Sequence, residues 1–490
     1  MEMFNCFFEG GRATWYLLIS AISSFIGIAS SGAILYQVYK RVSRKRLAKR
    51  RESFLSDITT REYIDWELNT LKALYPENSC YTLTTAEDRQ FPVITKLASD
   101  SIKYSPEKLH FDGFTTELKK DYIETIDREI RCNKLPQYRQ FHSIVSDQVR
   151  YPDLIGYANT KIKFDDKGRV CGFVAQPRSY KETVYSCHVL QYELWKAFQR
   201  KKRIAIILRR NEIPQARLEE LPLRNMIHNG ELITKTIGKG KSQRKYLYLQ
   251  HKRRRLGDSK KEHTNCMWDT IFGGINRSSL CDVNIAILKK EKKEGDPSWS
   301  IALGRRSTNV ATFPGYWSIV PSGSFEMSEK MVIPKNKNNS LFLKKLEKNS
   351  DIILALFREY LEEVFNETDY EHPNGDDDIN KLKGNKHIQS LKDTCSSGLA
   401  KFVFLGACFN LVVLRQTFSF ALIINDDSMK QLQHNDENVV LEFMPLQDLK
   451  QLINAEDALM VELAGTYNLL KENAAKLWPD MEENPFKNVT

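Results

Sequence analysis

The sequence predicts an α+β protein with an N-terminal transmembrane helix, an α+β middle domain, and a C-terminal α/β/α sandwich with a mixed sheet. Three observations lead to this prediction. No residue from Ala13 to Tyr39 is charged, and roughly 20 apolar residues suffice to cross a bilayer. Short strand and helix patterns alternate through about residue 263. In the last part of the chain, strand patterns stand on both sides of one amphipathic helix, an order typical of α/β sandwiches.

Length and composition indicate a globular protein of roughly two or three folding units. Of its 490 residues, 41% are hydrophobic and 28% are charged. Most of the formal net charge of +11 comes from lysines and arginines that directly follow the apolar run. The charge therefore does not indicate nucleic-acid binding, and we predict no specific nucleic-acid partner. The nine cysteines include no Cys-x-x-Cys pair, so we expect reduced, buried thiols rather than a zinc site.

The N-terminal part is divided into an external N-terminus (1–12), a transmembrane helix (13–39) and a basic juxtamembrane segment (40–55). Because positive charges follow the span, we expect a single-pass membrane protein with its N-terminus outside and its C-terminal domains in the cytoplasm. The basic segment would also bind anionic membrane lipids. Small residues recur every four positions within the span, which would suit a homo-oligomer. A hydrophobic hairpin or a core helix is the alternative interpretation of the apolar run.

The middle domain (56–234) has no role that its residues reveal. A capping box from Thr59 to Glu62 predicts the start of a helix. Strand patterns flank an Asp-Lys-Gly turn within 161–175, and a helix over 187–198 is expected to lead into a strand over 203–208. The domain contains no phosphate-binding loop and no nucleophile elbow.

His188 stands alone on its predicted helix, so we interpret it as a structural histidine rather than a ligand. Residues 235–268 are rich in lysine and arginine and are interpreted as a basic linker. Contact of this linker with lipid or with an anionic nucleotide is the alternative.

The C-terminal domain (269–490) places a helix, over roughly 350–366, among several strands. The strands are expected over 281–290, 299–307, 401–426 and 438–446. The helix carries Glu359, Glu362 and Glu363, whose spacing of three and four residues puts them on one face. There they repel one another unless a cation lies between them. Taken alone, the same pattern also fits a surface helix with solvated glutamates.

The surroundings of these glutamates resemble a known motif. Gly323, Glu329 and the segment 358–363 (Arg-Glu-Tyr-Leu-Glu-Glu) are similar to the box of Nudix hydrolases, Gly-x5-Glu-x7-Arg-Glu-apolar-x-Glu-Glu-x-Gly-apolar. The resemblance covers about residues 280–455. In this chain an insertion rich in lysine and asparagine lengthens the gap after Glu329, and Phe365 replaces the closing glycine. Asn366 tolerates the left-handed conformation, so we expect the helix to end there instead.

The resemblance implies a Nudix-like fold, a Mg²⁺ (or Mn²⁺) cofactor and a set of site residues. Oxygen ligands on a rigid helix suit Mg²⁺. The implied metal ligands are Glu359, Glu362 and Glu363, with the carbonyl oxygen of Gly323 and with Glu329 in support. Arg358 would orient the catalytic carboxylates. Arg305 or Arg306 would meet substrate phosphate, and Glu437 or Glu442 would act as base.

Two functions follow for a membrane-anchored chain of this kind. The first is a hydrolase that uses Mg²⁺ to cleave a pyrophosphate bond in a nucleoside diphosphate-linked substrate. The alternative is a sensor of a nucleotide or cyclic oligonucleotide that does not hydrolyse its ligand and acts on the membrane, because the architecture also resembles transmembrane-Nudix effectors of bacterial anti-phage systems. A purely structural membrane tether would leave the motif unexplained.

Overall fold

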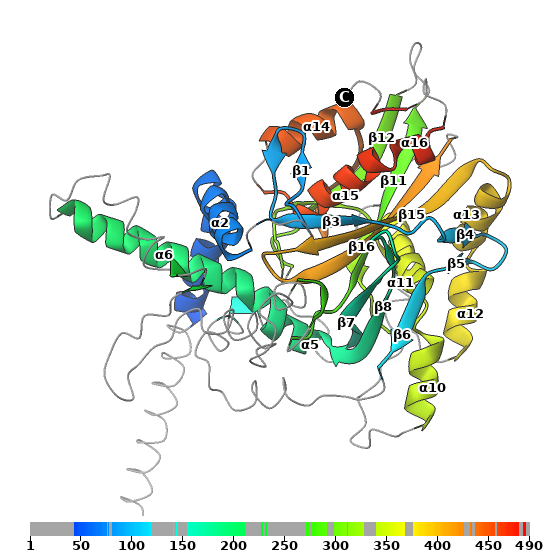
Figure 1. The fold of residues 1–490 in the computed structure, drawn as a ribbon, viewed down its shortest axis with the longest axis horizontal. Helices are drawn as coiled ribbons and strands as arrows, with labels where there is room; N and C mark the ends of the chain where they lie inside the picture. Colours follow the sequence, from blue (N-terminus) through cyan, green and yellow to red (C-terminus); the bar gives the residue numbers. More distant parts are fainter. Residues whose placement is uncertain are drawn as a thin grey trace, which may run out of the picture. The chain divides into compact units, whose positions relative to one another are not determined.

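The computed structural model describes residues 44–75, 81–119, 154–210, 271–327, 340–367, 376–425 and 437–479, with short gaps in some of these ranges, and a few residues elsewhere. The chain forms two compact units, Met1–Ser56 and Asp57–Thr490. In the first unit, residues 44–56 are helical. The elements described below belong to the second unit (Figure 1).

The second unit contains helices of widely different length. They are α2 (Arg61–Leu74), α5 (Tyr180–Thr183), the π-helical turn η2 (Val184–His188), α6 (Val189–Arg210), α10 (Ser340–Lys348), α11 (Ile352–Glu359), the π-helical turn η4 (Tyr360–Val364), α12 (Asp376–Gly384), α13 (Lys386–Ser396), α14 (Leu446–Ala455), α15 (Val461–Glu472) and α16 (Ala474–Leu477).

The main sheet has eight strands in the order β13-β12-β11-β16-β15-β3, with β14 paired to β11 and β17 paired to β12. They are β3 (Val93–Leu97), β11 (Asp282–Glu291), β12 (Ser298–Arg306), β13 (Trp317–Ile319), β14 (Ser322–Ser324), β15 (Ala400–Asn410), β16 (Arg415–Ile424) and β17 (Asn438–Pro445). β11 and β16 run parallel and their other partners run antiparallel, so the sheet is mixed. β3, from the stretch expected to form the middle domain, shares this sheet through its pairing with β15.

Smaller sheets complete the unit. A three-stranded sheet is formed by β6 (Thr115–Leu118), β7 (Ile155–Phe164) and β8 (Val170–Ser179). Two-stranded sheets are formed by β1 (Thr85–Ala86) with β2 (Arg89–Gln90), β4 (Lys103–Ser105) with β5 (His110–Asp112), and β9 (Ile227–His228) with β10 (Glu231–Leu232).

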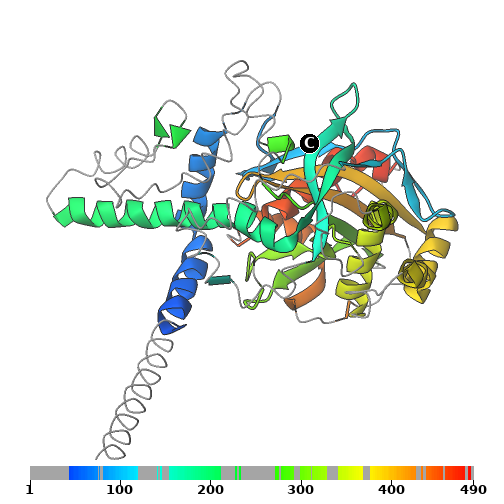
Figure 2. The same cartoon turned by 90° about the horizontal axis from the view of Figure 1, so that it is seen from below.

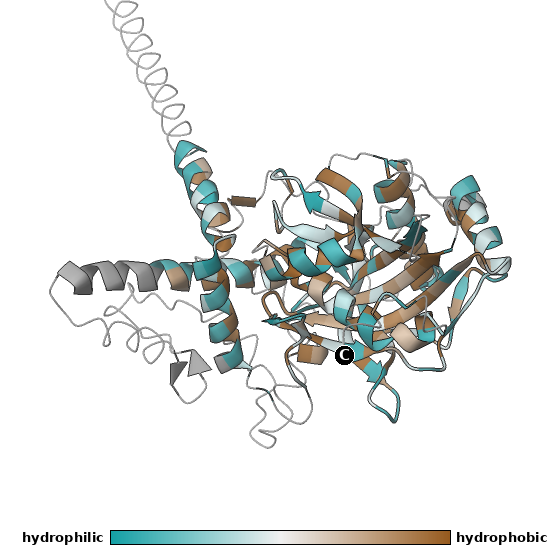
Figure 3. Cartoon of the chain, turned by 90° about the horizontal axis from the view of Figure 1, so that it is seen from above, coloured by the Kyte–Doolittle hydropathy of each residue, from teal (hydrophilic) through white to brown (hydrophobic). Residues whose placement is uncertain are grey.

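Alternating side chains of the buried strand β16 serve two separate cores. Ala421 and Ile423 join the core that α14 and α15 cover, while Phe418 and Phe420 point to the opposite face because successive residues of a strand alternate. On that face the ring of Phe173, from β8, lies 5.0 Å from that of Phe418. The central strands are therefore largely hydrophobic, as Figure 3 shows in brown.

The long helix α6 corrects two local predictions. The stretch 203–208, expected to be a strand, continues this 22-residue helix; a short apolar run fits a helix or a strand equally well, and no Gly or Pro interrupts this one. α6 lies across α2 (Figure 2), where the ring of Phe198 meets that of Tyr63 at 5.2 Å. The N-cap of α2 is Thr60 rather than Thr59, and its hydroxyl accepts from the Tyr63 amide at 3.3 Å.

The structure also corrects the predicted fold class and location. None of the helices in the described ranges is long and apolar enough to cross a membrane. Even α6 carries lysines and arginines along most of its length. Residues 1–12, 13–39 and 235–268 lie outside the described residues. The transmembrane helix and the single-pass location are therefore not supported, and the fold class becomes a mixed α and β protein with several sheets.

Candidate functional site

The carboxylate helix lies inside the protein rather than on its surface. α11 begins at the N-cap Asp351, whose carboxylate accepts from the Ile353 amide at 3.1 Å, and all eight of its residues are buried. It continues without interruption into the π-helical turn η4, a feature that often marks functional positions. Glu359 and Glu363 are 8% and 5% exposed. The alternative of solvated surface glutamates is therefore wrong for these two residues.

The end of this helix confirms the expectation for Asn366. Its φ of +52° is left-handed, as at helix ends that usually carry glycine. Phe365, at the position of the expected glycine, keeps a φ of −114°. The helix therefore ends one residue later than the family motif would end it.

Gly323 and Glu359 meet although the insertion separates them in the sequence. Gly323 is the central residue of β14. A Cβ added to it would lie 2.1 Å from the Cδ atom of Glu359, which is far inside van der Waals contact. Only glycine lets the carboxylate approach the backbone this closely.

Arg358 joins the helix to the segment after β14. Its Nη2 donates to the Glu359 carboxylate at 2.7 Å and to the Ser324 carbonyl at 2.9 Å, and its Nη1 donates to the Glu326 carbonyl at 3.2 Å. Its Nε lies 3.7 Å from Oε1 of Glu362. Burial lowers the pKa of the guanidinium, but the charges of Glu359, Glu362 and Glu326 outweigh this effect and raise the pKa above its usual value. The resemblance had assigned Arg358 an orienting role, and the geometry fits that role.

The carboxylates of Glu363 and Glu437 lie close enough to Glu359 for charges to interact. The Ser322 amide donates to Oε2 of Glu363 at 2.6 Å. Burial raises the pKa of Glu363 well above its usual value, and the charges of Glu437 and Glu359 raise it further. Burial also raises the pKa of Glu359. The charge of Arg358 opposes this rise, and the charge of Glu437 adds to it. The charge of Glu437 thus disfavours the ionisation of both Glu359 and Glu363.

Most of the predicted residues border one cavity of about 250 Å³. Its walls include Gly323, Arg358, Glu359, Glu362, Arg306 and Glu437. Glu363 holds the Ser322 amide at the cavity wall. By contrast, Arg305 is exposed and donates to the Gly315 carbonyl at 3.2 Å. Glu442, on β17, is also exposed and is paired with Leu303 of β12. Glu329 lies outside the described residues.

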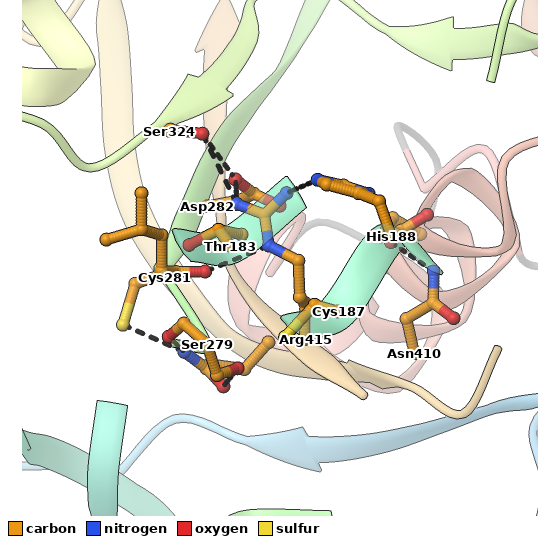
Figure 4. Close-up of polar contacts among 12 residues, drawn as sticks. Thr183, Cys187, His188, Ser279, Cys281, Asp282, Ser324, Asn410 and Arg415 are labelled. Carbon is orange, nitrogen blue, oxygen red and sulfur yellow. Dashed lines mark hydrogen bonds and ion pairs between the residues drawn. The ribbon is translucent and has the colours of Figure 1, made fainter. Parts of the chain in front are cut away.

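Sequence reasoning missed a second part of the cavity wall, which is built around Arg415 (Figure 4). The guanidinium of Arg415 is bonded to Asp282, and its Nη1 lies 3.0 Å from Nε2 of His188. Since a guanidinium can only donate, this His188 nitrogen accepts, and the imidazole is neutral. Burial, followed by the charge of Arg415, keeps the pKa of His188 well below its usual value. His188 is thus hydrogen-bonded as a structural histidine would be, but it also borders the cavity.

One sequence signal pointed to this wall. Arg415 is the only charged residue of the sequence between Phe402 and Asn425, a stretch with a strand pattern, and arginine is almost never fully buried without a partner. Its partners could not be identified beforehand because they come from distant parts of the chain. Burial raises the pKa of Asp282 to about 6 despite the opposing effect of Arg415, and it raises the pKa of Glu326, also at the cavity, to about 8.

The kinds of side chain at the cavity fit a divalent cation, although their present arrangement does not yet form a complete site. Carboxyl groups outnumber guanidinium groups: Asp282, Glu326, Glu359, Glu362, Glu437 and Glu462 against Arg306, Arg358 and Arg415. A hard cation with oxygen ligands would relieve this excess. In the described ranges, however, no three His, Cys, Asp or Glu side chains are placed to hold a metal ion.

Comparisons with known proteins do not establish a family. No protein-family model matches the chain, and no curated protein matches it. Among solved structures, a Nudix hydrolase from Alicyclobacillus acidocaldarius is similar over 39% of this chain and 89% of its own, with 13% identity and a TM-score of 0.23. With a TM-score below 0.5, this match does not establish a Nudix fold for any part of the chain. It supports neither an activity nor the predicted resemblance to transmembrane effectors.

Proposed function

We propose that the protein is a hydrolase that cleaves the pyrophosphate bond of a nucleoside diphosphate-linked compound, with Mg²⁺ or Mn²⁺ as cofactor. The contact of the Glu359 carboxylate with Gly323 carries the proposal. It joins the glycine and the helix of the recognised motif in space despite the insertion between them. Arg358 reinforces the contact by bonding to both parts.

The proposed roles follow from position. Glu359, Glu362 and Glu363 would hold the cation together with the Gly323 carbonyl, and Arg358 would position Glu359 when it is not a ligand. Arg306, at the cavity, would meet a phosphate of the substrate; Arg305, which is exposed, would not. When bound, the cation would neutralise the pyrophosphate oxygens and make water more acidic.

The reaction adds water across the phosphoanhydride bond. A water oxygen forms a new bond to one phosphorus atom, the bridging P–O bond breaks, and two phosphomonoesters result. Glu437 would take the proton of the attacking water because it borders the cavity beside Glu359. Glu442, exposed on β17, is not placed for this step.

One observation favours a second candidate, a nucleotide-binding protein that does not cleave its ligand. Glu359 is already engaged by Arg358, and no three described carboxylates converge on one point. A ligand that left this ion pair intact could bind in the cavity without being hydrolysed.

Hydrolysis of a panel of nucleoside diphosphate-linked compounds by the full chain distinguishes the two candidates. The panel includes ADP-ribose and dinucleotides, assayed with Mg²⁺ by chromatography of the products. We expect turnover that falls at least about a hundredfold in Glu363→Gln and Glu437→Gln but stays near the wild-type rate in Glu442→Gln, the matched control on β17. Binding of the same compounds without products would refute the hydrolase and support the second candidate.

A further inference from the structure

Two buried oxygen atoms belong to residues that border the cavity on the side of α15. In the described part of the chain, neither Oδ1 of Asn284 nor Oε2 of Glu462 has a hydrogen-bond partner. Both residues border the cavity, and they are only 2% and 6% exposed. Buried polar atoms normally have a partner. Two such acceptors, in residues that line one cavity, indicate a site where a ligand supplies donors.

The remaining atoms of both side chains are fixed. The Nδ2 of Asn284 donates to Oγ1 of Thr466 at 3.1 Å, and Oγ1 of Thr466 also lies 2.9 Å from Oγ of Ser419. Thr466 can therefore accept from Asn284 while donating to Ser419. This arrangement leaves Oδ1 of Asn284 as the free acceptor.

Glu462 is held by Asn410 in the same way. The Oδ1 of Asn410 accepts from the amides of Val412 and Val413 at 2.8 and 3.2 Å, which turns its Nδ2 toward Glu462. That Nδ2 donates to Oε1 of Glu462 at 2.7 Å. Glu462 lies one helical turn before Thr466, the residue that holds Asn284. The two unpartnered oxygens thus belong to neighbouring side chains.

The two neighbouring acceptors, Oδ1 of Asn284 and Oε2 of Glu462, favour a part of the ligand that carries hydrogen-bond donors. They repel phosphate oxygens, which are themselves acceptors, and they attract a group with adjacent N–H or O–H donors. In a nucleoside such pairs occur at the amino–imino edge of guanine and at the two hydroxyls of ribose. The phosphates would then lie toward Arg306 and the α11 glutamates, which border the same cavity.

We propose that Glu462 and Asn284 form the subsite that binds the nucleoside part of the ligand through paired donors. The proposal rests on the proposed function in placing the phosphates at α11. It does not require that the ligand be cleaved. These two residues therefore decide which nucleotides bind, while the glutamates of α11 and η4 decide whether they are hydrolysed.

The test measures nucleotide preference by calorimetry with the full chain and Mg²⁺. The probes are GDP, IDP, which lacks the 2-amino group, and 2′,3′-dideoxy-GDP, which lacks both hydroxyls. If the guanine edge is bound, GDP binds about tenfold or more tightly than IDP. If the ribose is bound, GDP and IDP bind equally and the dideoxy compound binds at least about tenfold more weakly.

Two variants and a control connect the preference to the subsite. Glu462→Gln keeps the bond from Asn410 and turns an N–H group toward the cavity, so it should abolish whichever preference the wild type shows. Asn284→Ala should reduce the same preference and provides an independent test. Glu472→Gln, at an exposed position of the same helix, should leave it unchanged. Circular dichroism confirms that each variant is folded.

The subsite would be overturned if the wild type bound none of the three probes or bound all three equally. It would also be overturned if both variants kept the wild-type preference. A preference lost in both variants, in a chain without turnover, would support the subsite and refute the hydrolase. Turnover without any preference would support the hydrolase and refute the subsite.

Discussion

Replacing Gly323 by alanine tests the contact on which the site depends. The new Cβ would lie 2.1 Å from the Glu359 carboxylate, whereas ordinary van der Waals contact begins near 3.4 Å. The carboxylate would therefore have to move by ~1 Å or more. Because Nη2 of Arg358 holds it at 2.7 Å, this movement also disturbs a buried ion pair. Overpacking costs ~1–3 kcal/mol, and we expect Gly323→Ala to destabilise the protein by about 2 kcal/mol.

The same shift should reduce hydrolysis about a hundredfold, because a misplacement of ~1 Å in an active site has that effect. Urea unfolding and initial rates measure the two effects. Gly384→Ala is the matched control: no atom lies within 4 Å of its added Cβ, so its stability and rate should stay near those of the wild type. In the background of Glu359→Asp, whose carboxylate is shorter, Gly323→Ala should cost at least ~1 kcal/mol less. Equal costs in the two backgrounds, or a fully active Gly323→Ala variant, would refute the proposed contact.

Three further predictions concern stability. Arg358→Leu should destabilise the protein by ~3–5 kcal/mol in urea unfolding, because it leaves Glu359 buried without its cation; a loss below ~1 kcal/mol would contradict a stabilising role of the Arg358–Glu359 ion pair. Burial raises the pKa of Glu67 to about 7, although a bond from Tyr63 opposes this, so the folded state binds the proton more tightly than the unfolded chain. The contribution of the protonated Glu67 carboxyl to the free energy of unfolding is complete below about pH 4.5 and is lost as the pH rises through 7. Unfolding measured at pH 5 and pH 8 should therefore show a loss on the order of 1–3 kcal/mol in the wild type that Glu67→Gln lacks; parallel curves would exclude Glu67 as the cause. Finally, Mg²⁺ at ~100 times its Kd should stabilise the wild type by ~2.7 kcal/mol, and Glu363→Gln should lose most of that gain in thermal unfolding, whereas an equal gain in both would place the cation elsewhere.

The sequence predicted those parts of the site that lie in one motif. The strands around the helix, the helix itself and the left-handed Asn366 follow from local pattern and residue type, whereas Gly323 was included only through the resemblance to the Nudix motif. The wall around Arg415 does not, because its partners Asp282 and His188 come from separate elements that only the folded chain brings together. The misassigned strand over 203–208 has another cause: apolar periodicity in a short run does not distinguish helix from strand.

The central claim is that this cavity cleaves a pyrophosphate bond. The most direct measurement is phosphorus NMR of ADP-ribose incubated with the full chain, once with Mg²⁺ and once with EDTA. We predict that the pyrophosphate signals give way to phosphomonoester signals with Mg²⁺ only, and that Glu363→Gln abolishes the change. Pyrophosphate signals that persist with Mg²⁺ for this compound and for the rest of the nucleotide panel would contradict the claim.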